Sequence, residues 1–172
     1  MQYFSMVQDD RLSGELVFAS SKGKGLLGDQ KLETPAALYV QGGARAEYSD
    51  YLERPYPLIS DAMYRITKKY WPVPELGMVA LIDEATRKQR IYWSLELEPS
   101  DCISVTSEQD KLGLVRTLVL DESRIPPVPL FQVVFLRQVF VMVRLDLAES
   151  MLRREMFGFR LIAIDTIRKD EV

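Results

Sequence analysis

Polar and apolar residues alternate most regularly in the middle of the chain. Residues 76–83 and 90–98 have a period of two and flank a polar stretch, residues 84–89, which is the pattern of a long β-hairpin. The alternation in the second arm assigns Ile91, Trp93, Leu95 and Leu97 to one face and Tyr92, Ser94 and Glu96 to the other. We expect one dry and one wetter side of this sheet, with the Ile91 side dry.

A first helix is predicted in residues 57–72, where apolar residues recur at helical intervals. Ser60 or Asp61 can cap its first turn, and Pro72 prevents its continuation. Lys68 and Lys69 fall near the end of this helix, where cations suit the free carbonyl groups. The predicted apolar stripe consists of Ile59, Ala62, Met63, Ile66 and Tyr70.

A second helix is predicted in residues 144–158. Asp146 stands where an N-cap is expected and Glu149 follows three residues later, which indicates a capping box, while Gly158 can end the helix. The predicted stripe is Leu147, Ala148, Met151, Leu152 and Met156. This stripe favours packing on a sheet, although a stripe containing methionines can also recruit a partner helix.

The remaining apolar segments are short and β-like. They predict strands at residues 3–8, 14–20, 36–41, 102–106, 115–122, 134–143 and 159–164, the first two as an opening pair. The proline-rich residues 123–131 indicate an extended crossover. The fold class that follows is α+β, a largely antiparallel sheet with two principal helices on one face. We expect a single domain, residues 1–172, with N-terminal strands and loops in residues 1–50 and the main α+β unit in residues 51–168.

Charge and composition narrow the range of partners. The chain has 172 residues, 47% hydrophobic, and a net charge of −3 from 22 basic and 25 acidic residues without a long run of one sign. We therefore expect no nucleic-acid partner. The N-terminal residues lack a signal-peptide pattern, no apolar run approaches the length that crosses a bilayer, and Cys102 is the only cysteine. The expected location is the cytoplasm, without membrane association.

The chain contains no histidine, which removes the commonest general base and the commonest metal ligand. Imidazole-activated nucleophiles and zinc sites of the Cys and His type are excluded, whereas carboxylate chemistry is not. The adjacent acids Asp9 and Asp10, Asp83 and Glu84, and Asp121 and Glu122 each end an apolar run. We interpret them as turn residues. We predict no catalytic, cofactor-binding or metal-binding residue and no cofactor.

Three other features have a functional and a structural reading. Residues 23–31 place glycines like a phosphate loop, but Asp29 and Gln30 stand where Lys and Ser or Thr are required, so we interpret the segment as a polar loop. Tyr70 and Trp71 could contact a ligand, but the end of an amphipathic helix favours core packing. Cys102 has apolar neighbours and is expected to be a small buried hydrophobe.

Three segments together resemble bacterial immunity proteins of polymorphic toxin systems. The first, residues 54–74 (RPYPLISDAMYRITKKYWPVP), resembles that family's capped helix and following aromatic and proline-rich element. The second, IYWSLELEPSDCIS from Ile91, resembles its tyrosine-bearing strand. The third comprises LVLDESRIPPVPLFQV from Leu118 and FVMVRLDLAESMLRREMFGFRLI from Phe140, and it resembles the later strand, second helix and Gly-Phe ending. The similarity spans roughly residues 52–165.

The resemblance implies a non-enzymatic protein that binds and neutralises a cognate toxin domain in the cytoplasm, without a cofactor. An aromatic and acidic patch is the expected binding surface. Two alternatives stay open from the residues themselves. One is a carboxylate-dependent enzyme or binding protein for a small molecule, and the other is a structural module that self-associates, for example as a homodimer.

Overall fold

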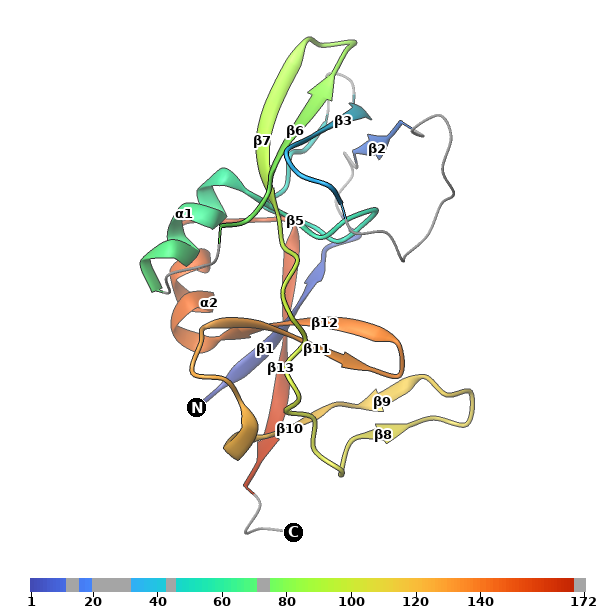
Figure 1. Ribbon diagram of the computed structural model, residues 1–172, viewed down its shortest axis with the longest axis vertical. Coiled ribbons are helices and arrows are strands. Elements are labelled where there is room, and N and C mark those ends of the chain that lie inside the picture. The colour runs from blue at the N-terminus through green and yellow to red at the C-terminus, as the bar shows by residue number, and fades with distance from the viewer. Residues whose placement is uncertain (12–15, 20–31, 43–45, 71–74, 169–172) are drawn as a thin grey trace. The chain divides into compact units, whose positions relative to one another are not determined.

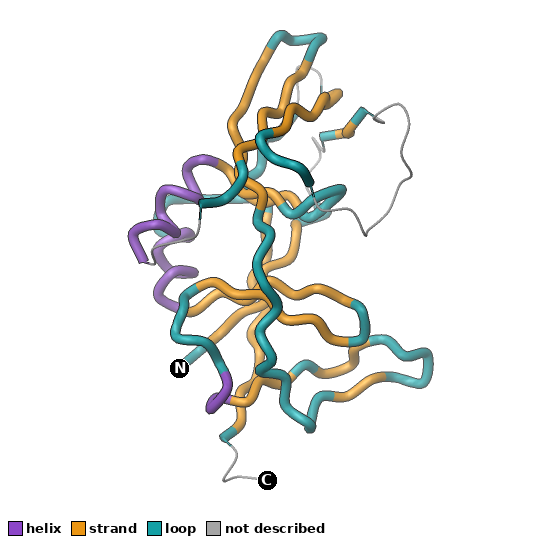
Figure 2. Tube along the Cα trace, viewed as in Figure 1, coloured by secondary structure: helices purple, strands orange, loops and turns teal. Residues whose placement is uncertain are grey.

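The computed structural model describes residues 1–11, 16–19, 32–42, 46–70 and 75–168. Strands make up most of its regular structure (Figure 2). The chain forms two compact units. Unit 1 consists of Met1–Val7, Leu97–Arg154 and Arg160–Val172, and unit 2 consists of Gln8–Glu96 and Glu155–Phe159. The single-domain organisation stays a prediction.

Unit 1 contains a five-stranded sheet with the order β10-β13-β1-β12-β11 (Figure 1). Its strands are β1 (Tyr3–Gln8), β10 (Val119–Asp121), β11 (Leu130–Phe135), β12 (Gln138–Arg144) and β13 (Phe159–Ile167). A separate two-stranded ribbon joins β8 (Glu108–Gln109) to β9 (Val115–Thr117). The short 3₁₀ helix η2 (Glu122–Arg124) follows β10, and helix α2 (Leu145–Leu152) follows β12.

One face of the unit 1 sheet carries a hydrophobic core of Tyr3, Cys102, Leu118, Leu120, Phe131, Val133 and Met142. Cross-strand pairs on β11 and β12 supply part of it, because Phe131 lies opposite Met142 in an antiparallel register. The predicted inward positions Leu118 and Leu120 are confirmed, with Val115 packed against the same cluster.

Unit 2 contains a six-stranded sheet with the order β2-β3-β6-β7-β5-β4. Its strands are β2 (Val17–Phe18), β3 (Ala36–Gln41), β4 (Tyr51–Leu52), β5 (Leu58–Ser60), β6 (Met78–Asp83) and β7 (Lys88–Ser94). Helix α1 (Asp61–Tyr70) follows β5 directly and contacts β5 and β7. The predicted hairpin of β6 and β7 is confirmed, and β3 pairs with β6 in parallel.

The unit 2 core lies against one face of this sheet. It contains Leu16, Val40, Leu52, Leu58, Val79, Leu81 and Tyr92. Tyr92 is 1% exposed, and its hydroxyl donates a hydrogen bond of 2.6 Å to the carbonyl oxygen of Ser49. Burial therefore removes the ring from water without leaving its polar tip unpaired.

Three strand predictions are wrong. Residues 102–106 form no strand, since they contain an isolated bridge at Ile103 followed by a turn. The opening segments do not pair with each other, since β1 pairs with β12 and β2 pairs with β3. Residues 134–143 are not one strand, because β11 and β12 meet there in a tight hairpin. Its central residues, Leu136 and Arg137, have φ of 51° and 65°, which matches a type I′ turn. Neither residue type favours that conformation, so the turn leaves no signal in the sequence.

The helix predictions have mixed outcomes. The Ser60 cap is confirmed, since its hydroxyl oxygen accepts the Met63 amide at 3.1 Å. The capping box of the second helix is wrong: Arg144 occupies the N-cap position without a side-chain bond, Asp146 pairs with Arg144, and Glu149 pairs with Arg153.

Both apolar stripes are partly wrong. In α1, Ala62 and Tyr70 are exposed, whereas the buried residues are Met63, Tyr64, Ile66 and Thr67. In α2, Leu152 is exposed. The α2 helix ends earlier than predicted, and Glu155, with φ of 55°, lies in the left-handed region ahead of Gly158 at φ 90°.

The fold class is α+β, rich in sheet and with two α-helices among the described residues. The sheets are mixed, since β3 with β6 and β10 with β13 are parallel pairs. The two helices contact strands of different sheets, α1 in unit 2 and α2 in unit 1. That they cover a common face stays a prediction. In the part of the chain described, none of the helices has the length and apolar character needed to cross a membrane.

Candidate functional site

The acidic pairs singled out in the sequence serve local structure. The carboxylate of Asp9 accepts the backbone amide of Arg11 and pairs with its guanidinium at 2.8 Å. Asp121 caps η2 by accepting the amide and hydroxyl of Ser123 at 3.0 and 2.6 Å. Glu122 binds Arg168 at 2.8 Å, and this guanidinium lowers the pKa of Glu122. The turn interpretation is confirmed for Asp9 and Asp121.

Asp83 is also a turn residue, but it is buried. Its carboxylate accepts the amides of Ala85 and Thr86 at 3.0 and 3.3 Å in the β6–β7 turn. Burial opposes its ionisation, yet the hydrogen bonds from Thr86 and Ala85 outweigh burial and lower its pKa. Across the described ranges, no group of three or more Cys, Asp or Glu side chains is arranged to hold a metal ion.

Cys102 belongs to the unit 1 core, and the expectation of a buried hydrophobe is confirmed. Burial raises the pKa of its thiol to about 11. The core interpretation of Tyr70 is wrong, because this ring is 39% exposed at the end of α1. Residues 23–31 and Trp71 lie outside the described residues.

The most distinctive surface is the face of the unit 2 sheet opposite its core, which we call the outer face. The strand registers define it as three rows of neighbouring residues across β3, β6 and β7, extended by β2. The rows are Met78 with Trp93, then Ala37 with Ala80 and Ile91, then Tyr39 with Ile82 and Gln89, while Val17 lies beside Gln41 at the β2 end.

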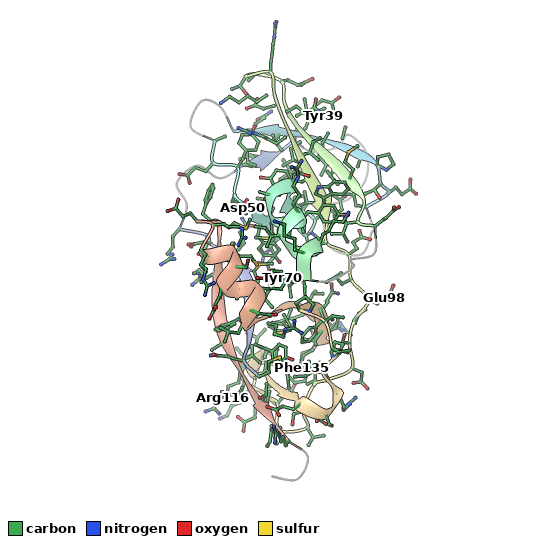
Figure 3. All side chains as sticks on the ribbon, turned by 90° about the vertical axis from the view of Figure 1, so that its left-hand side faces the viewer. Tyr39, Asp50, Tyr70, Glu98, Arg116 and Phe135 are labelled. Carbon is green, nitrogen blue, oxygen red and sulfur yellow. The ribbon has the colours of Figure 1, made fainter. Side chains whose placement is uncertain are left out.

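The outer face is apolar and yet accessible to solvent. Val17, Tyr39 and Met78 are 59%, 49% and 44% exposed, and they are the large hydrophobic residues exposed on the described strands of unit 2. Ala80, Ile82, Ile91 and Trp93 are half-buried. Tyr39 is among the residues labelled in Figure 3. Tyr92 and Ser94 on the other face are buried, so the prediction that the Ile91 side is the dry one is wrong for Ile91 and Trp93. It is confirmed for Leu95, which is fully buried.

The charged residues of the same hairpin lie on the core side or at its turn. Asp83 lies opposite Lys88, and Leu81 lies opposite Arg90, in register positions that alternate with the outer face. Arg90 extends over the ring of Tyr48 at 5.5 Å. The outer face itself carries only apolar residues and the uncharged Gln41 and Gln89.

Helix α1 borders the outer face at its Trp93 end. Tyr64 stacks on Trp93 with ring centroids 4.2 Å apart, and the indole N–H of Trp93 donates to Asp61 Oδ1 at 3.0 Å. Asp61 also pairs with Arg65 at 2.8 Å. The Lys68 ammonium lies over the Tyr64 ring, 5.1 Å from its centroid. This border of the outer face thus carries the Asp61–Arg65 ion pair and the exposed Lys68 ammonium. The acidic patch expected from the sequence stays a prediction.

This arrangement can bind a protein surface. Specific interfaces concentrate Tyr, Trp, Met and Arg in their centres and exclude Lys, Glu and Asp from them. The sequence reasoning missed the outer face because it assigned one dry side to each strand. A signal was present: Met78, Ala80 and Ile82 alternate with Val79 and Leu81, so β6 is apolar on both faces.

Comparison of the chain with models of known protein families and with curated protein sequences finds no match.

Proposed function

We propose that this protein is a non-enzymatic immunity protein that binds and neutralises a cognate bacterial toxin domain in the cytoplasm. The sequence resemblance over residues 52–165 suggests the class. The observation that carries the proposal is the outer face, an uncharged and partly exposed sheet surface containing Tyr39, Met78 and Trp93. Exposed apolar surface of this composition is costly in water and is stabilised when a partner protein covers it.

Neutralisation requires only that binding is tight and specific. A partner that covers or distorts the catalytic cleft of a toxin stops its activity without chemistry by the inhibitor. Such a role fits the places of the candidate reactive residues. Asp83 and Asp121 stabilise turns, and Cys102 packs in the core of unit 1, so these side chains do not meet in one reactive cluster.

The test is a growth assay with the toxin domain encoded by the reading frame adjacent to this gene. Expression of that domain alone should arrest growth, and co-expression of this protein should restore it. A toxin domain of unrelated sequence is the matched control and should stay lethal. Failure to restore growth, or equal protection against both domains, would refute the proposal.

A further inference from the structure

The proposed function leaves open which surface meets the toxin and what chemistry that surface selects. We propose that the outer face and the Lys68 ammonium together form the docking site, and that the bound partner presents an apolar segment flanked by a carboxylate. This inference rests on the proposed function, because it names the site and the partner chemistry of that same binding event.

The dimensions of the outer face make it the centre of an interface. Three strands span about 10 Å and three alternate rows span about 14 Å. This area is smaller than the roughly 800 Å² that each partner buries in a standard interface. Binding energy is usually concentrated in such a central apolar cluster, and the surrounding contacts mainly exclude water. The surrounding surface therefore has to supply the specificity.

At the α1 border, the surrounding surface carries a positive charge beside Tyr64. Arg65 and Asp61 pair with each other at 2.8 Å, so their charges cancel, and the charge that remains over the Tyr64 ring is the Lys68 ammonium. Lys68 is exposed, lies over Tyr64, and forms no ion pair with a carboxylate in the described part of the chain.

A docked partner changes the solvation of Lys68. The contacts from Lys68 to Tyr64 and from Tyr64 to Trp93 place the ammonium at the border of the apolar rows. Covering these rows removes water from the cation, and an unpaired charge taken out of water is expensive. A carboxylate opposite Lys68 offsets that cost and rejects partners without one. At the far border, the Tyr39 hydroxyl and the Gln41 and Gln89 amides can accept or donate hydrogen bonds.

The chain provides a matched pair of residues for the test. Lys68 and Lys69 are adjacent, exposed and in the last turn of α1, but only Lys68 lies over Tyr64. K68E and K69E change the net charge and the helix end equally. Binding to the purified toxin domain of the adjacent reading frame should weaken at least tenfold with K68E and less than threefold with K69E.

Truncations test the apolar centre in the same assay. Y39A and M78A should each weaken binding at least tenfold. L114A removes a comparably exposed side chain (52%) from unit 1 and should leave binding unchanged. A toxin variant with its contacting carboxylate changed to Lys should restore binding to K68E. Circular dichroism and thermal melting of every variant separate lost contacts from lost folding.

The outcomes distinguish the two proposals. If the toxin binds and K68E, Y39A and M78A are all neutral, the docking site is refuted and the proposed function stands.

If the toxin does not bind, the proposed function fails, and the docking site is then tested by selecting binders of this protein from a displayed random peptide library. Enrichment of apolar sequences with Asp or Glu, lost on K68E but kept on K69E, supports it, whereas no enrichment refutes it. A concentration-dependent dimer that Y39A and M78A dissociate also refutes it, since a second copy would then occupy the face.

Discussion

Removing the hydroxyl group of Tyr92 should destabilise unit 2, and the structure sets the size of the effect. The group donates a 2.6 Å bond to the Ser49 carbonyl, and both residues are buried. Y92F therefore leaves a buried acceptor without this donor, which costs about 1–3 kcal/mol. Tyr39 is 49% exposed, so Y39F should change stability by less than about 0.5 kcal/mol.

Equilibrium unfolding in urea followed by tryptophan fluorescence measures this difference. Both tryptophans of the chain, Trp71 and Trp93, fall within Gln8–Glu96, so the signal reports on unit 2. With a urea dependence of about 2 kcal/mol per molar, the Y92F midpoint should fall by about 1 M. Equal midpoints for wild type, Y92F and Y39F would show that the hydrogen bond contributes nothing and would refute the reasoning.

The same pair has a defined pH dependence. Burial raises the pKa of Tyr92 above its ordinary value of 10.0. The folded state thus favours the neutral phenol, and the resulting stability is complete below pH 10 and is lost as pH rises further. Wild type should lose stability above pH 10 more steeply than Y92F, so the gap between them should narrow. If the difference in stability between wild type and Y92F grew above pH 10, the expected direction of the pH dependence would be wrong.

Three further measurements follow from local geometry. G158A should lower the free energy of unfolding in urea by about 2–3 kcal/mol, because Gly158 has φ of 90° and packs directly against Ser49. G113A should cost only about 1 kcal/mol, because Gly113 has φ of 77° but lies in open space. Equal costs for the two variants would contradict the packing argument. Burial raises the pKa of the Cys102 thiol from 9.0 to about 11, so at pH 8 it should react with a thiol reagent at least about a hundredfold more slowly in the folded protein than in urea. The raised pKa also implies that the folded protein loses stability between about pH 9 and 11. Fast labelling of the folded protein would contradict the burial of Cys102. S60A should lower stability by about 1–2 kcal/mol through loss of the α1 cap, and an unchanged thermal melting temperature would show that the cap is dispensable.

The predictions that succeeded rest on local information. The period of two in residues 76–98 defines the β6–β7 hairpin, and the position of Ser60 before an apolar repeat defines the start of α1. Both depend on neighbours within a few residues, where side-chain period and capping chemistry act.

The failed predictions of strand pairing and of the buried face depend on distant partners. β1 pairs with β12, more than 130 residues along the chain, and no local pattern encodes that register. Alternation also shows which residues share a face without showing which face is packed. Ile91 and Trp93 are more hydrophobic than Tyr92 and Ser94, yet the latter are buried because the N-terminal segment carrying Ser49 packs there. The outer face was misassigned for this reason.

The discontinuous make-up of unit 1 has a consequence for biosynthesis. Its strand β1 ends at Gln8, but β12 and β13, its neighbours in the sheet, are translated only after residue 137. Unit 2 needs little beyond residue 96 and can collapse while translation continues. Until β12 and β13 emerge, β1 lacks both of its neighbours in the sheet, and a ribosome that stalls before β12 would release a polypeptide with unpaired strand edges, which promote aggregation.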